Sequence, residues 1–187
     1  MAPDKPLFPS TPLVQILAAA NFAARAHAQQ KRKGAAAEPY INHLIEVAEL
    51  VAASGHDADV NLIMACFLHD VVEDTSVTRH ELAQAFNDDV VSLVMEVTDD
   101  KSLPKEVRKA KQVQSAPAKS LRAQTLKLAD KISNLRSLLS SPPSNWSTER
   151  KLEYFQWARA VVYGFTSPNQ YLLNEFERTC ARISDLT

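Results

Sequence analysis

A histidine and three carboxylates follow directly on an apolar stretch in the first half of the chain. His69 and Asp70 come after an apolar run over residues 60–68. Glu73 and Asp74 follow them at a spacing of four, one helical turn further along. Because a buried carboxylate without a partner is costly, acids in such company must be hydrogen-bonded, ion-paired or bound to a metal. The stretch therefore favours a metal site with catalytic carboxylates beside it.

The same stretch has a simpler interpretation as an ordinary helix end. In that case the His69–Asp70 pair only caps the helix, and Glu73 and Asp74 face solvent. Short motifs produce many chance matches, so this stretch by itself leaves both interpretations open.

A second histidine elsewhere in the chain can contribute to such a metal site. His43 shares a helical face with Val47 and Leu50, at spacings of four and seven, which predicts that it points toward the core. A single histidine in that position is usually only a hydrogen-bonded core residue. The second histidine–acid motif at His69 makes His43 a candidate ligand as well.

Asp130 is the fourth candidate ligand, on a helix expected over residues 118–139. It lies roughly opposite the apolar stripe of that helix, which favours exposure to solvent. Leu126 and Ala123 lie beside it, however, and they favour a helix that is covered on two sides. With the two histidines and Asp70, it would complete a set of two imidazoles and two carboxylates from three helices. Such a set suits a first-row divalent ion such as Mn²⁺, Fe²⁺ or Zn²⁺.

The segments that must position these residues are expected to be helices. Glycine is scarce, with 3 residues, and no segment alternates as a strand does. Helices are expected over residues 12–30, 41–53, 59–74, 78–86, 88–97, 104–115, 118–139, 148–164 and 168–187. Residues 1–11 are expected to form an extended lead-in. We therefore predict a single all-α domain over residues 1–187, built as a helical bundle.

Local signals mark some of the helix ends. Thr78 and Glu81 have the spacing of a capping box, and Pro104 suits the first turn of a helix. His27 lies near the end of the first expected helix. A histidine in that position is usually a surface or capping residue, so we expect no functional role for it.

Composition limits the partners and the location of the protein. Its 187 residues, 45% of them hydrophobic, suffice for one packed core. The 21 basic and 22 acidic residues give a net charge of −1, so no global positive field is expected to attract long nucleic acids. The two cysteines cannot build a disulfide framework or a Cys-based zinc motif. No membrane-spanning run or signal peptide is apparent, so a cytoplasmic location is expected.

Four segments, taken in order, resemble the hydrolase domain of the RelA/SpoT alarmone enzymes, in the HD superfamily of metal-dependent phosphohydrolases. These segments are Tyr40-Ile41-Asn42-His43, Phe67-Leu68-His69-Asp70-Val71-Val72-Glu73-Asp74-Thr75, Val97-Thr98-Asp99-Asp100-Lys101 and Lys127-Leu128-Ala129-Asp130-Lys131. The resemblance extends from about residue 17 to the end of the chain. The length and the lack of a synthetase region make the chain similar to the single-domain small alarmone hydrolases of the Mesh type.

The resemblance implies a set of metal ligands, catalytic residues and a substrate. The implied Mn²⁺ ligands are His43, His69, Asp70 and Asp130. The implied catalytic carboxylates are Glu73 and Asp74. The implied substrate is guanosine 3′,5′-bis(diphosphate) (ppGpp) or its pentaphosphate relative (pppGpp), cleaved to GDP or GTP and pyrophosphate. The fold expected from the resemblance is the HD-type helical bundle.

Further residues are expected to bind this substrate. Cationic side chains that can neutralise its diphosphates are Lys31, Arg32, Lys33 and Lys101. The basic run at residues 31–33 also has a simpler interpretation as a solvated helix end. On the family pattern, the nucleoside is expected to contact Asn134 and Tyr154.

Two alternative functions remain open. One is a metal-dependent phosphatase acting on another nucleotide with a 2′- or 3′-phosphate, such as NADPH, which the resemblance to the animal relatives also suggests. The other is a non-catalytic nucleotide-binding module. Glu73 and Asp74 argue against the second alternative, because a pure binder does not need two costly carboxylates beside a metal.

Overall fold

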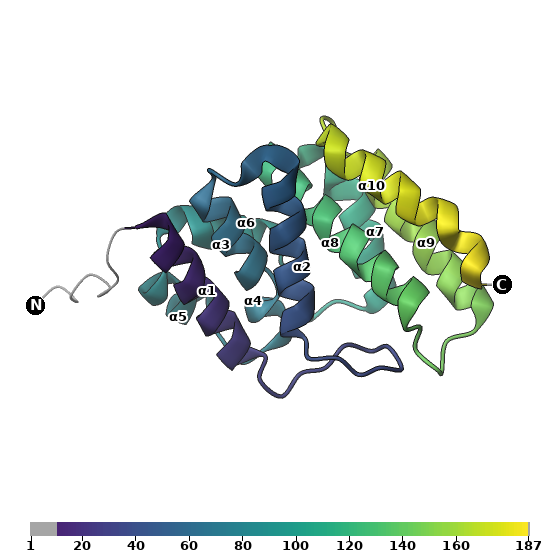
Figure 1. The fold of residues 1–187 in the computed structure, drawn as a ribbon, viewed down its shortest axis with the longest axis horizontal. Coiled ribbons are helices and arrows are strands. Elements are labelled where there is room, and N and C mark those ends of the chain that lie inside the picture. The colour runs from purple at the N-terminus through teal and green to yellow at the C-terminus, as the bar shows by residue number, and fades with distance from the viewer. Residues whose placement is uncertain (1–10, 187) are drawn as a thin grey trace, which may run out of the picture.

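The computed structural model describes residues 11–186, and Figure 1 shows how their helices are arranged. The α-helices are α1 (Pro12–Ala26), α2 (Ile41–Val51), α3 (Val60–Leu68), α4 (Val71–Asp74), α5 (Arg79–Ala85), α6 (Asp88–Val97), α7 (Lys105–Ser115), α8 (Leu121–Ser140), α9 (Thr148–Tyr163) and α10 (Gln170–Ala181). A π-helical turn follows α2 (Ala52–His56), and 3₁₀ turns lie at Ala116–Ala118 and Arg182–Leu186. Within residues 11–186, β pairing is limited to one isolated bridge between Lys31 and Pro39. The all-α prediction is confirmed; apart from Thr11, the expected lead-in lies outside the described residues.

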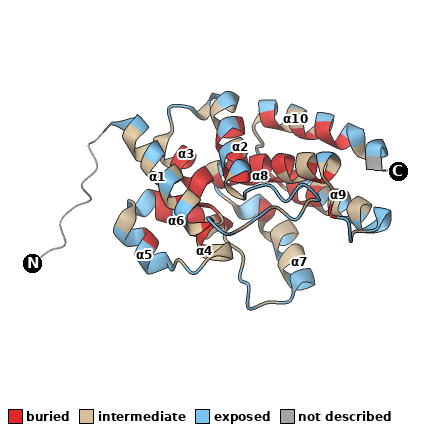
Figure 2. Ribbon diagram, turned by 60° about the horizontal axis from the view of Figure 1, so that its bottom comes forward, coloured by how far each residue is buried: buried red, intermediate tan, exposed pale blue. Residues whose placement is uncertain are grey.

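Helices α3 and α8 form the centre of the molecule, and α2 packs against both of them. Figure 2 shows that most of α3 and α8 is buried. Apart from Asn61 near its start, helix α3 is apolar, and it is covered by α1, α2 and α6. Burial of each large aliphatic side chain contributes about 1.5–3 kcal/mol, so these contacts hold the central helices firmly in place.

A break at His69 and Asp70 separates α3 from α4, so the prediction of one helix over residues 59–74 was wrong. In a continuous α-helix, the carbonyl of Cys66 would accept the amide of Asp70. Here the Cys66 carbonyl accepts a hydrogen bond from Nδ1 of His69 at 2.8 Å. This side-chain contact competes with the regular backbone pattern and places both site residues at a helix junction.

Helix α8 is enclosed on nearly all sides, because α2, α6, α9 and α10 all contact it. Its buried residues include three charged ones, Lys127, Asp130 and Lys131, with exposed fractions of 6%, 6% and 3%. The two-sided cover expected from Leu126 and Ala123 is therefore present, and the exposure expected from the apolar stripe is not. Charged groups in such a position need polar or ionic partners.

Several local predictions agree with the structure. Helix α6 spans the predicted residues, and the capping box of α5 is formed, with the Glu81 amide donating to Thr78 Oγ1 at 3.2 Å. Helix α1 ends at Ala26, earlier than predicted. Among the described helices, none has the length and apolar character needed to cross a membrane.

Candidate active site

Two buried histidines from different helices meet at the centre of the molecule. The rings of His43, on α2, and His69, after α3, have centroids 5.3 Å apart. The Nδ1 of His69 donates to the Cys66 carbonyl. The Nδ1 of His43 donates to the Ser133 hydroxyl at 2.8 Å, and that hydroxyl donates to Glu46 at 2.6 Å. Both rings therefore hold a proton on Nδ1 and present Nε2 to the interior, as metal-binding histidines do.

Two carboxylates face these Nε2 atoms. An oxygen of Asp70 lies 3.1 Å from Nε2 of His69 and 3.7 Å from Nε2 of His43. An oxygen of Asp130 lies 3.4 Å from Nε2 of His43 and 3.8 Å from Nε2 of His69. Despite these distances, neither buried Nε2 makes a well-aligned hydrogen bond within residues 11–186. Atoms that surround a common point without bonding each other are arranged as ligands of one cation would be.

The metal-ligand geometry is tightest for three of the four predicted ligands. Single ligand atoms of His43, His69 and Asp130 all lie within 4.8 Å of one another. Asp70 adjoins this group through its short distance to His69. All four predicted ligands are thus brought together, from α2, from the junction of α3 and α4, and from α8.

Electrostatics in this cluster favours a positive charge at its centre. Burial acts to raise the carboxyl pKa values, but the histidines hold the pKa of Asp70 far below its usual range, and Lys131 with the histidines does the same for Asp130. Burial lowers the pKa of His43. Burial also acts to lower the pKa of His69, but the neighbouring carboxylates raise it to about 10. A divalent cation fits a site with this charge balance.

The ligand carboxylates are themselves held by hydrogen bonds. Tyr40 donates its hydroxyl to Asp70 at 2.5 Å. Burial and the charge of Asp70 raise the pKa of Tyr40, so the hydroxyl keeps its proton and remains a donor. Asn134 donates to Asp130 at 2.6 Å, and Lys131 donates to the other oxygen of Asp130 at 3.2 Å. Such partners orient ligand groups before a metal binds.

Glu73 lies on α4, in the cavity that Asp70 and Asp130 also line. Its carboxylate accepts the backbone amide of Asp99 at 2.9 Å, and Nη1 of Arg108 lies 3.8 Å from its other oxygen. Burial raises the pKa of Glu73, which makes it a better proton acceptor than an exposed carboxylate.

Asp74 is fixed by a different set of contacts. It forms an ion pair with Lys101 and accepts a hydrogen bond from Gln30 at 3.2 Å. Nδ1 of His27 donates to the side-chain oxygen of Gln30 at 2.7 Å, and the His27 ring stacks on Tyr40 with centroids 4.9 Å apart. His27 is the C-cap of α1, one of the two positions expected for it, but it is buried, with an exposed fraction of 3%.

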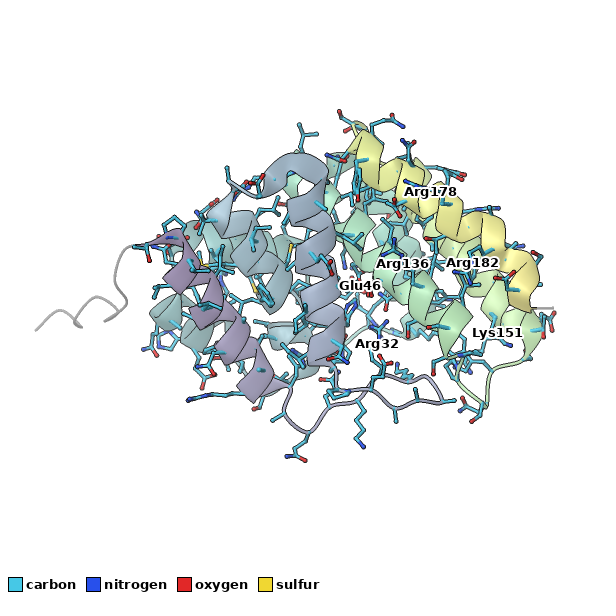
Figure 3. All side chains as sticks on the ribbon, in the orientation of Figure 1. Arg32, Glu46, Arg136, Lys151, Arg178 and Arg182 are labelled. Carbon is cyan, nitrogen blue, oxygen red and sulfur yellow. The ribbon has the colours of Figure 1, made fainter. Side chains whose placement is uncertain are left out.

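The predicted substrate-binding residues line two connected cavities. The first contains all of them except Lys101, namely Lys31, Arg32, Lys33, Asn134 and Tyr154. Here Arg32 donates to the side-chain oxygen of Asn134 at 3.1 Å; Figure 3 shows Arg32 close to the lower ends of α2 and α8. The second cavity, of about 330 Å³, contains Lys101 with Glu73 and Asp74. Lys33, Asn134 and Tyr154 line both, so a bound molecule can extend from one into the other.

Three cations in the second cavity were not predicted from the sequence as site residues: Arg108, Lys127 and Lys131. Lys127 and Lys131 flank Asp130 on α8. Both belong to the segment at residues 127–131 that resembles the family, and this was the only indication in the sequence that they lie at the site. Arg108 belongs to α7, whose polar sequence is typical of a surface helix. Nothing in that sequence indicates that Arg108 lies at a functional site. Its position 3.8 Å from Glu73 on α4 is visible only in the structure.

Comparison with known proteins places the chain in a family. The HD-domain family matches residues 19–155. Proteins of Xenopus tropicalis and Homo sapiens, both named guanosine-3′,5′-bis(diphosphate) 3′-pyrophosphohydrolase MESH1, are each 48% identical over 84% of this chain and 88% of their own. A solved structure, described as a metazoan ortholog of SpoT that hydrolyses ppGpp, is 38% identical, with a TM-score of 0.87 over 95% of this chain and 98% of its own. The chain therefore belongs to the HD-domain family, in the group of the RelA/SpoT-type hydrolases of the MESH1 kind.

Proposed function

We propose that this chain is a metal-dependent hydrolase that cleaves the 3′-diphosphate from ppGpp or pppGpp, leaving GDP or GTP and releasing pyrophosphate. The observation that carries the proposal is the convergence of His43, His69 and Asp130 within 4.8 Å, beside the buried carboxylate of Glu73. The relatives named for this activity, which are 48% identical, support the choice of substrate.

The proposed metal ligands are His43, His69, Asp70 and Asp130, and the proposed metal is Mn²⁺. Two free Nε2 atoms and two preoriented carboxylates support this assignment, since nitrogen and oxygen ligands together suit first-row divalent ions. A cation bound there lowers the pKa of its bound water and polarises a phosphoryl oxygen.

Glu73 is the proposed general base. Its carboxylate takes a proton from the attacking water, whose oxygen bonds to the phosphorus attached to the ribose 3′ oxygen. The bond between that phosphorus and the 3′ oxygen breaks, and the 3′ oxygen leaves with the proton that Glu73 took from the water. The raised pKa of Glu73 makes it a stronger proton acceptor than an exposed carboxylate. Asp74, held by Lys101 and Gln30, orients the water.

The proposed substrate-binding residues fit a nucleotide with two phosphate chains. Lys31, Arg32 and Lys33 supply positive charge to the first cavity, and Lys101 supplies it to the second. The nucleoside contacts are Asn134 and Tyr154. The Tyr154 ring lies against Trp146, with centroids 5.8 Å apart. The two rings give the first cavity an aromatic wall against which a base can stack.

A substrate panel with metal analysis on the same sample tests the proposal. Purified protein supplied with Mn²⁺ should convert ppGpp to GDP and pyrophosphate, and the metal should be present at one ion per chain. Faster release of orthophosphate from NADPH would favour the alternative phosphatase. Nucleotide binding without any turnover would favour a binding module. The Glu73→Gln variant serves as the control for contaminating hydrolases.

Three further features expected from the sequence are also proposed here: a single domain over residues 1–187, a cytoplasmic location, and no affinity for long nucleic acids. One cooperative unfolding transition, cell fractionation and a filter-binding assay with duplex RNA test them in turn.

A further inference from the structure

Lys127 is a buried cation without a partner beside the catalytic carboxylates. Its exposed fraction is 6%, and within residues 11–186 its ammonium group has no hydrogen bond or ion pair. Lys131, the other buried lysine on α8, differs in this respect. It donates to Asp130 and lies over the ring of Trp157, 4.4 Å from its centroid. The Lys127 ammonium is not among the fully buried polar atoms without a partner in the described residues, so it is open to the cavity and can donate to an anionic ligand there.

Arg108 supplies a second incompletely satisfied cation in the same cavity. Its Nε is buried and has no hydrogen-bond partner among the described residues. Its contact with Glu73, at 3.8 Å, is longer than a hydrogen bond. The guanidinium group therefore retains donors for a ligand, and its forked geometry matches a phosphate group. Together, Arg108 on α7 and Lys127 on α8 offer two positive charges to the cavity that contains Glu73.

These cations line the cavity of Glu73, which the nucleoside contacts Asn134 and Tyr154 reach from the first cavity. The first cavity contains Arg32 and Asn134 but neither Arg108 nor Lys127. Arg108 instead lines both the cavity of Glu73 and a larger adjoining one of about 640 Å³. A molecule whose nucleoside occupies the first cavity and whose reacting phosphate lies near Glu73 therefore continues toward Arg108.

We infer that Arg108 and Lys127 form a subsite for the terminal phosphate of the 3′-diphosphate, the phosphate farther from the ribose. This inference rests on the proposed function and deepens it, because it names the residues that distinguish a 3′-diphosphate from a 3′-monophosphate. The phosphate attached to the ribose lies at Glu73, and the terminal phosphate accepts hydrogen bonds from the guanidinium and ammonium groups. Such bonds between ionised partners are short and strong.

The test compares two substrates that differ only in this phosphate: ppGpp and guanosine 5′-diphosphate 3′-monophosphate. In Arg108→Gln and in Lys127→Met, the ratio of kcat/KM for the diphosphate to that for the monophosphate should fall by about 10- to 100-fold, the range expected for a lost charge-assisted hydrogen bond. The matched control is Lys111→Gln, which removes one positive charge from an exposed position on the same helix. It should leave the ratio unchanged.

Inhibition by the products gives an independent readout. Pyrophosphate should inhibit Arg108→Gln less strongly than the wild type by a similar factor, while inhibition by orthophosphate stays the same. The inferred subsite would be refuted if both variants kept the wild-type ratio of kcat/KM for the diphosphate to that for the monophosphate, and the wild-type inhibition constant for pyrophosphate. If the wild type does not cleave ppGpp, the proposed function fails. Calorimetric binding of pyrophosphate to the wild type and to Arg108→Gln, both with Mn²⁺, then tests the subsite separately: equal affinities refute it.

Discussion

Nδ1 of His43 and the hydroxyl of Ser133 lie 2.8 Å apart and join α2 to α8 at the candidate metal site. The same hydroxyl donates to Glu46, which in turn pairs with Arg136 at 3.2 Å; Figure 3 shows Glu46 and Arg136 facing each other between the two helices. Because a carboxylate can only accept, Ser133 must accept from the imidazole. The contact therefore keeps the proton of His43 on Nδ1 and leaves Nε2 free.

Replacing Ser133 with alanine removes the group that sets this tautomer. We expect Ser133→Ala to weaken Mn²⁺ binding by about 10- to 100-fold, as loss of a hydrogen-bond partner to a metal-binding histidine usually does. Competition between the protein and a chelator of known affinity measures the change. The control is Ser140→Ala, at an exposed position near the end of the same helix. An affinity equal to the wild type in Ser133→Ala would show that other contacts fix the ring.

Asp130 should be needed for metal retention. Its Oδ1 lies near both Nε2 atoms, and its Oδ2 pairs with Lys131. Asp130→Asn keeps the shape of the side chain but removes its negative charge, so we expect loss of stoichiometric Mn²⁺. Asp130→Ala should also lose the metal and should cost about 3–5 kcal/mol of stability, because it leaves Lys131 buried without its partner. Elemental analysis after dialysis measures the metal, and stoichiometric Mn²⁺ in Asp130→Asn would refute the ligand role.

Elements specified by local chemistry could be predicted from the sequence. Helix α6 and the capping box of Thr78 and Glu81 depend on residues within a turn of one another, and both were predicted correctly. The break after α3 could not be predicted in this way. It depends on His69 taking the carbonyl of Cys66 from the helix, and the apolar pattern on either side contains no sign of that competition.

The burial of site residues depends on contacts between distant segments. Asp130 lies opposite an apolar stripe, yet it is buried against His43 of α2 and His69 after α3. His27 is buried because the chain after α1 folds back, with the Tyr40 amide bonding to the Gln30 carbonyl at 3.0 Å. Periodicity within one helix cannot reveal such cover. The resemblance of ordered motifs located the site, but the support from His27, Gln30 and Tyr40 became visible only in the structure.

His27 should affect both stability and turnover. His27→Ala removes a buried ring that stacks on Tyr40 and frees Gln30, which holds Asp74. We expect a loss of about 1–3 kcal/mol in the free energy of unfolding and a fall of about tenfold in kcat, with KM nearly unchanged. Denaturant titration and steady-state kinetics with ppGpp measure the two effects.

The matched control for His27 is His80→Ala, since His80 is exposed on α5 and should change neither quantity. His27→Gln provides a second comparison, because it can still donate to Gln30 but cannot stack on Tyr40 as a ring does. Recovery of kcat without recovery of stability in His27→Gln would separate the two roles. If His27→Ala has the kcat of the wild type, then the contact from His27 through Gln30 to Asp74 does not contribute to turnover.

The pH dependence of turnover should report the buried position of Glu73. Burial raises its pKa above the ordinary value of 4.5, and the charges of Asp70 and Asp99 act in the same direction, against the Asp99 amide and Lys127. The base must be ionised to accept a proton, so kcat/KM should fall as the pH drops through this raised pKa. The midpoint of the acid limb should therefore lie above pH 4.5, and Lys127→Met should move it higher still.

Glu73→Gln should keep metal and nucleotide binding while kcat falls by about 10²- to 10⁴-fold. An acid limb at or below pH 4.5, or an unchanged rate in Glu73→Gln, would contradict the assignment of Glu73 as the base.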